Sequence, residues 1–117
     1  LANLEKGLQA TLKKGYKDLV VSKDIKLVAP TIAESGANVP IEIEAALPAD
    51  QVKAIHCFCD KNANPLLFSM ETLGVLPYFA TRVRVAETAP VRAIVETKDG
   101  KLLMAAQSVR VTVGGCG

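Results

Sequence analysis

The chain has 117 residues, of which 50% are hydrophobic and 22% are charged, and this size fits a single domain. Its net charge of +2 and its 4% aromatic content argue against the basic surface and stacking platforms of a nucleic-acid-binding protein. The longest uncharged stretch, residues 72–81, is too short to span a membrane as a helix. A mean hydropathy of +0.25 is high for so small a chain and predicts a partner subunit that covers apolar surface.

Residues 1–15 are predicted to form a short amphipathic helix. Leucines recur at helical spacing at positions 1, 4, 8 and 12, and two lysines precede Gly15, which is typical of a helix stop. The segment is charged throughout and lacks the apolar run of an export signal. We therefore expect that, if the protein is exported, its signal has been removed or it travels with another protein.

Residues 16–113 are predicted to form an antiparallel β-sandwich, because short apolar runs alternate with Pro, Gly, Asn and Asp. Asp99-Gly100 predicts a hairpin with a type I′ turn, which needs positive φ at both residues. The predicted strands are Ile25–Ala29, Val39–Ala46, Lys53–Cys59, Leu66–Met70, Tyr78–Val85, Val91–Thr97, Leu102–Ala106 and Val109–Val113.

The strand predicted at 53–59 is apolar on both faces, so one face can fill the core while the other needs a cover of its own. The sequence does not decide which face is which. One set consists of Ile55, Cys57 and Cys59, and the other of Val52, Ala54 and Phe58 together with His56. The second set is one candidate for contact with a partner subunit.

No metal site or cofactor is expected at His56, Cys57 and Cys59. On a strand, His56 points away from the two cysteines, so the three cannot converge on one tetrahedral ion. A disulfide between Cys57 and Cys59 would lie near the upper distance limit for a bridge. We predict that both are buried free thiols. His56 is the only histidine, and no catalytic residue has a local signature, which favours a noncatalytic protein.

The remaining polar segments are interpreted without a specific role. Residues 60–65 predict a turn between two strands. Four arginines at positions predicted to face outward are typical of a solvated surface, namely Arg82, Arg84, Arg92 and Arg110.

The sequence ends in Gly114-Gly115-Cys116-Gly117, which predicts a flexible arm that carries one thiol. The glycines lack a Cβ atom, and the three steps from Val113 to Cys116 span roughly 10 Å, so the arm can enter a narrow cleft. An exposed thiol oxidises and cross-links readily, so we interpret Cys116 as a handle on which other proteins act. The alternatives are an assembly module with an interchain disulfide, an incidental tail cysteine, and a thiol-dependent enzyme.

The tail resembles that of the SoxY family of sulfur carriers, whose signature is Gly-Gly-Cys-Gly-Gly after a valine-rich strand. This chain has Gly114-Gly115-Cys116-Gly117 and lacks the last glycine of that signature. Residues 30–40, PTIAESGANVP, resemble the family segment Pro-x-Ile-Ala-Glu-Asn-Gly-x-x-Val-Pro. Residues 60–62, 64–65 and 81–85 are also similar, so the resemblance extends from about Ile25 to the end of the chain.

This resemblance implies a periplasmic, noncatalytic carrier with an immunoglobulin-like β-sandwich, which forms a heterodimer with SoxZ. It implies that Cys116 holds intermediates of thiosulfate oxidation covalently. It further implies three transient partners: a haem enzyme that ligates thiosulfate to the thiol, a dimanganese hydrolase that releases sulfate, and a molybdenum-haem sulfane dehydrogenase. Within this scheme, Val52, Ala54 and Phe58 are a candidate contact with SoxZ.

Overall fold

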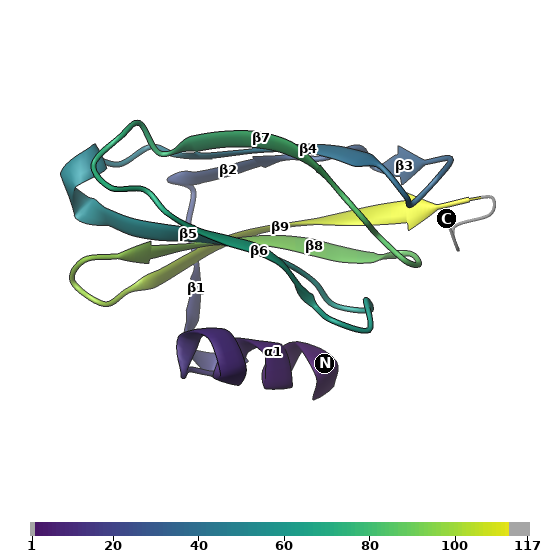
Figure 1. Ribbon diagram of the computed structural model, residues 1–117, viewed down its shortest axis with the longest axis horizontal. Coiled ribbons are helices and arrows are strands. Elements are labelled where there is room, and N and C mark those ends of the chain that lie inside the picture. The colour runs from purple at the N-terminus through teal and green to yellow at the C-terminus, as the bar shows by residue number, and fades with distance from the viewer. Residues whose placement is uncertain (1, 113–117) are drawn as a thin grey trace.

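Two β-sheets packed face to face, with one helix on the outside of the larger sheet, make up the fold (Figure 1). The structure is a computed structural model that describes residues 2–112. The elements are α1 (Ala2–Leu12), η1 (Tyr16–Asp18), β1 (Leu19–Val21), β2 (Ile25–Val28), β3 (Ile32–Ala33), β4 (Val39–Ala45), η2 (Ala49–Gln51), β5 (Val52–Cys59), β6 (Leu66–Glu71), β7 (Tyr78–Val83), β8 (Ala89–Thr97) and β9 (Leu102–Val111). Within this described part, no helix is long and apolar enough to span a membrane.

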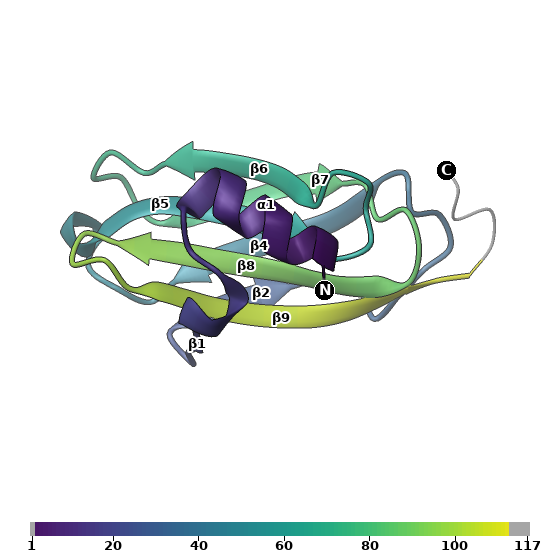
Figure 2. The ribbon, with the colours of Figure 1, turned by 90° about the horizontal axis from the view of Figure 1, so that it is seen from below.

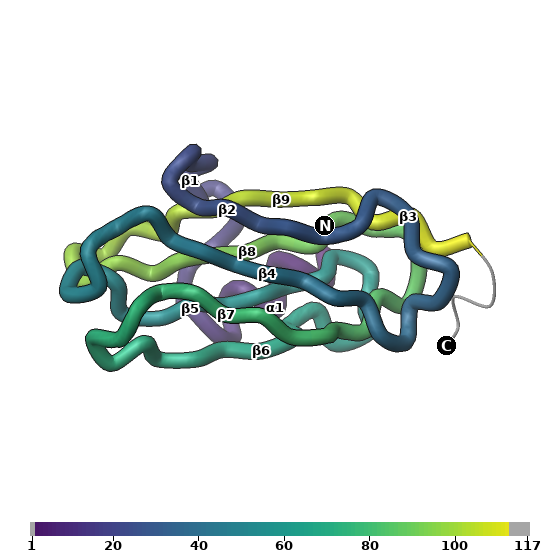
Figure 3. The backbone as a smooth tube through the Cα atoms, turned by 90° about the horizontal axis from the view of Figure 1, so that it is seen from above, coloured from purple at the N-terminus to yellow at the C-terminus, as the bar shows by residue number. Residues whose placement is uncertain are grey.

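The larger sheet has the strand order β1-β9-β8-β5-β6, and the smaller sheet has the order β2-β4-β7 (Figures 2 and 3). Most pairs are antiparallel, which confirms the predicted mainly β, immunoglobulin-like sandwich. Two short strands were not predicted. Both β1 and β3 pair with β9 in parallel, and they are too short for their sequences to show a strand period.

The C-terminal hairpin differs from its prediction in two details. The two strands predicted after residue 101 form one continuous strand, β9, because Gln107 and Ser108 continue the ladder to β8. The hairpin at Asp99-Gly100 is confirmed, but the type I′ turn is wrong. Gly100 has a φ of 91°, whereas φ is not positive at Asp99, and the amide of Gly100 donates to the carbonyl of Thr97 at 3.0 Å. This geometry is that of a three-residue loop with one left-handed glycine.

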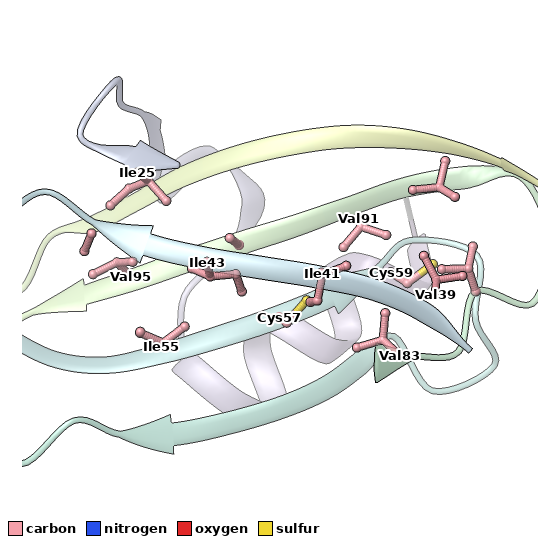
Figure 4. Packing of buried hydrophobic residues seen from close by; sticks show 14 of the residues in the cluster. Ile25, Val39, Ile41, Ile43, Ile55, Cys57, Cys59, Val83, Val91 and Val95 are labelled. Atoms are coloured by element: carbon pink, nitrogen blue, oxygen red, sulfur yellow. The ribbon is translucent and has the colours of Figure 1, made fainter. Parts of the chain in front are cut away.

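The space between the sheets holds the main core (Figure 4). Strand β4 alternates between buried and exposed residues along its whole length, as predicted, and turns Val39, Ile41 and Ile43 inward. From the larger sheet, Ile55 and the two cysteines of β5 face the same core. The face of β5 that carries Ile55, Cys57 and Cys59 is therefore the one that fills the main core, which the sequence did not decide.

The opposite face of β5 is covered by α1, which creates a second, smaller core. Phe58 is fully buried there with Leu4 and Leu8 of the helix. The predicted contact of Val52, Ala54 and Phe58 with SoxZ is therefore wrong, because this chain's own helix covers Phe58. Val52 does not even share that face: the pairing of β5 with β8 shifts register between Val52 and Ala54, and Val52 packs in the main core.

The helix is expected to contribute to folding stability through its buried leucines. Replacement of Leu8 by alanine keeps a good helix former but empties buried volume, so the free energy of unfolding should fall by about 2–5 kcal/mol. Urea unfolding followed by circular dichroism measures this change. Lys6→Ala, on the exposed side of the same helix, is the control and should change stability by less than about 0.5 kcal/mol. Equal losses in the two variants would contradict the second core.

Candidate functional site

The residues predicted to carry the chemistry lie outside the part of the chain that the structure describes. Cys116 and the glycines at 114, 115 and 117 belong to residues 113–117, whereas the description ends at Thr112. Four steps of the chain join Thr112 to Cys116, so the covalent backbone limits their separation to about 14 Å. The candidate site is therefore the arm base, defined here as residues 109–112 of the chain and the groups that bind them.

One edge of the arm base is bound by the segment that includes β3. The register pairs Ile32 with Arg110 and Ala33 with Val111. The amide of Arg110 donates to the carbonyl of Thr31 at 2.9 Å, and the amide of Thr112 donates to the carbonyl of Ala33 at 3.1 Å. The backbone is thus hydrogen-bonded up to the last described residue.

The other edge of the arm base is bound by β8 and the residue before it. Ala89 pairs with Val109, and the hydroxyl of Thr88 accepts a hydrogen bond from the amide of Val111 at 2.9 Å. The same hydroxyl donates to the carbonyl of Val111 at 3.5 Å. A strand that is bonded along both edges is fixed in direction, so the described backbone ends at a defined point, Thr112.

A buried asparagine ties two neighbouring loops together at the same end of the sandwich. Asn62 donates through Nδ2 to the carbonyl of Arg84 at 2.7 Å, and its Oδ1 accepts from the amide of Ala86 at 2.9 Å. The carbonyl of Gly36 accepts from the amide of Val85 at 2.8 Å, which links this region to the segment around β3. The segments that resemble the SoxY family therefore meet around the arm base.

A buried ion pair anchors the first residue of the 60–65 segment. The carboxylate of Asp60 binds Arg92 at two points, with distances of 2.8 Å to Nε and 2.9 Å to Nη2. The two side chains are 8% and 9% exposed. The hydrogen bonds that Arg92 donates to Asp60 raise the pKa of the guanidinium, which also lies 5.1 Å from the ring centre of Tyr16. The expectation that Arg92 belongs to a solvated surface is wrong, because its partner lies far away in the sequence.

Cys57 and Cys59 are unsuited to carry a substrate. Both are free thiols with no exposed surface, as predicted. Burial, with a smaller effect of neighbouring Cys59, raises the pKa of Cys57 to about 12, and burial also raises the pKa of Cys59. The thiolate is the nucleophilic form of cysteine, so these two side chains are inert at neutral pH.

His56 points away from the cysteines, as predicted, and both of its ring nitrogens have partners. Nδ1 lies 2.7 Å from the hydroxyl of Ser69, and Nε2 lies 3.1 Å from a carboxylate oxygen of Glu96. Partial burial alone would raise the pKa of Glu96, but His56 and Lys53 lower it overall. Among residues 2–112, no group of three acidic, histidine or cysteine side chains is arranged to hold a metal. The contacts of His56 with Ser69 and Glu96 arise from the pairing of neighbouring strands, so no residue spacing in the sequence predicts them.

The three cysteines are expected to differ sharply in reactivity. At pH 8, a thiol with a pKa of about 12 is ionised in about one molecule in ten thousand, so Cys57 should resist alkylation. Brief iodoacetamide treatment of native protein, followed by peptide mapping, should modify Cys116 and spare Cys57 and Cys59. Unfolded protein is the control and should be modified at all three positions. Rapid native labelling of either strand cysteine would contradict their assignment as inert core residues.

The ion pair between Asp60 and Arg92 is expected to be important for stability. Asp60→Ala leaves a buried guanidinium without its partner, so the free energy of unfolding should fall by about 3–5 kcal/mol. Lys61→Ala, at the exposed neighbouring position, should change it by less than about 0.5 kcal/mol. Chemical denaturation of the two variants tests this difference. A neutral effect of Asp60→Ala would contradict this expectation, because it would mean that Arg92 finds water or another partner once the carboxylate is removed.

Comparison with known proteins supports the interpretation of these features. Residues 9–116 match the family model described as sulfur oxidation protein SoxY. The structure of the sulfur carrier protein SoxY from Chlorobium limicola f thiosulfatophilum is 31% identical, with a TM-score of 0.79, over 96% of this chain and 98% of that one. A search of curated proteins gave no match.

Superoxide reductases share the fold alone. The enzyme (neelaredoxin) from Ignicoccus hospitalis is 11% identical, with a TM-score of 0.68, over 85% of this chain and 100% of that one. A putative superoxide reductase from Thermotoga maritima is 13% identical, with a TM-score of 0.66, over 85% and 98% of the two chains. By its match to the family model over nearly its whole length, and by its likeness to a SoxY structure, this chain belongs to the SoxY family of the sulfur-oxidation system.

Proposed function

We propose that this protein holds intermediates of thiosulfate oxidation covalently on Cys116 and presents them to the enzymes of the Sox system. The observation that carries the proposal is the SoxY family match, which extends to residue 116 and so includes the tail cysteine. The doubly bonded arm base supports it, because it gives the tail a fixed origin at the surface. The inert Cys57 and Cys59 support it as well, since they leave Cys116 as the attachment point.

The chemistry of a thiol suits this role. Joining the Cys116 thiolate to the outer sulfur of thiosulfate forms one S–S bond and releases two electrons, which the haem partner accepts. Hydrolysis by the dimanganese partner then removes the sulfonate group as sulfate, and the sulfane dehydrogenase oxidises the sulfur that remains on the cysteine. Each step acts on a bond to sulfur, and S–S bonds can be formed and cleaved reversibly where an ester or amide handle could not take part.

In this proposal the chain itself contributes no catalytic group. His56 is engaged on both nitrogens, and Arg92 is engaged by Asp60, so these polar residues stabilise the fold. The chain works as one subunit of a heterodimer with SoxZ in the periplasm, after loss of an export signal or by export together with a partner. An assembly module that uses Cys116 for an interchain disulfide is the competing function, and no described contact favours it.

The direct test is the mass of the intact protein after reaction with thiosulfate and the haem partner enzyme. Wild-type chain should gain a reductant-labile adduct that maps to Cys116, whereas Cys116→Ser should gain none, because an alkoxide forms no S–S bond. Cys59→Ala is the matched control and should load like wild type, since Cys59 is buried. An adduct that persists in Cys116→Ser would refute the attachment site. A disulfide-linked dimer as the sole modified species would favour the assembly module.

A further inference from the structure

The two long sides of the sandwich are protected very differently. On one side, the edge of β9 is covered near both of its ends, by β1 at Leu102–Met104 and by β3 at Arg110–Val111. On the other side, β6 pairs only with β5, and β7 pairs only with β4, so each is the last strand of its sheet (Figure 3). Neither β6 nor β7 contains lysine or proline, the residues that usually blunt a free edge. The open side therefore has the properties of an edge that another chain covers.

An apolar groove of about 810 Å³ runs between these two free edges. The rings of Phe68 on β6 and Phe79 on β7 both line the groove, and their centres lie 5.1 Å apart. Leu67 and Met70 add further apolar lining. The volume and the aromatic lining are those of a binding groove, although its position along two strand edges favours an extended polypeptide over a small molecule.

The loop between β6 and β7 lies at the end of the sandwich that is remote from the arm base (Figure 1). Leu73, Val75 and Leu76 are 82%, 61% and 72% exposed, which is unusual for three aliphatic side chains in one loop. We use the term β6–β7 surface for these three residues together with Leu67, Phe68, Met70 and Phe79.

The exposed loop is anchored at its base and strained at its tip. Buried Thr72 donates through its hydroxyl to the carbonyl of Val52 at 2.9 Å and through its amide to Lys53 at 3.2 Å. Leu73 takes a φ of 51°, which is costly for a residue that is not glycine. In this conformation the side chain of Leu73 points into solvent, where it buries no apolar surface against the rest of the chain.

The charges at the groove constrain what can occupy it. Its described lining includes Arg82 toward the arm base and no aspartate or glutamate. A complementary occupant therefore carries apolar side chains along most of its length and a carboxylate at the end near Arg82.

We propose that the β6–β7 surface is where SoxZ docks, by laying an extended segment along the free edge of β6. This inference rests on the proposed function only in taking SoxZ as the partner subunit. The surface occupies a long side of a molecule that measures 41 × 27 × 21 Å, whereas β9 stops at one end of it. A subunit bound along that side leaves Thr112 and the residues that follow accessible to the enzymes of the pathway.

The test measures the affinity of purified SoxZ for variants with matched controls. Leu76→Glu and Arg82→Glu change exposed side chains and should each weaken binding by at least about tenfold. Val21→Glu changes an aliphatic residue that is 77% exposed on β1, and Lys26→Glu reverses the charge of an exposed residue on β2. Both controls should bind within about twofold of wild type. Hydrogen exchange should slow at residues 66–71 when SoxZ binds, because strand pairing protects their amides.

The outcomes separate this inference from the proposed function. If wild-type chain binds SoxZ and all four variants bind equally well, the docking site is wrong while the carrier role stands. If Cys116→Ser binds SoxZ normally but fails to load sulfur, the two roles are independent, as expected. A failure of wild-type chain to bind SoxZ would overturn the heterodimer itself. A homodimer of this chain that Leu76→Glu dissolves would assign the surface to a second copy instead.

Discussion

The structure depends on the way in which β9 is paired. This strand bonds to β8 along one edge, and β1 and β3 cover its other edge near the two ends. In the function we propose, Cys116 presents its bound group to several enzymes, and the point at which the described backbone ends defines the region that the thiol can reach. Hydrogen bonds up to Thr112 fix that point. The side chains of Thr88 and Asn62 and the backbone of residues 31–36 are best understood as parts of this support.

Burial makes Cys57 and Cys59 chemically inert. The larger sheet is covered on both faces, by the smaller sheet on one and by α1 on the other, so β5 lies in the middle of the molecule. Desolvation there keeps Cys57 and Cys59 protonated and unreactive. Under the function we propose, these two inert thiols leave Cys116 as the one that reacts. Proteins named as superoxide reductases share this fold at 11% and 13% identity, and a shared fold does not by itself assign a chemistry.

The features that the sequence predicted correctly are those with a local signal. The alternation along Val39–Ala45 and the turn residues at Asp99-Gly100 define the sandwich, and the tail motif together with residues 30–40 identifies the family. The errors arise from contacts that are distant in sequence. The sequence predicts a solvated Arg92, but Asp60 pairs with it in the folded chain. It also predicts that Phe58 can contact a partner, but α1 covers that side chain. The role of Ile32 and Ala33 as a strand depends wholly on β9, since two residues show no period.

The same distinction explains why the open side of the sandwich could not be found in the sequence. Strands β6 and β7 look like ordinary strands, and only the topology shows that each ends its sheet with nothing beyond it. Free strand edges are commonly protected in native proteins, and on the β9 side the short parallel strands β1 and β3 cover the edge. Leaving the β6 side uncovered, with a groove and a strained leucine loop beside it, is costly for an isolated protein. In our proposal SoxZ covers this side, and its binding there offsets that cost.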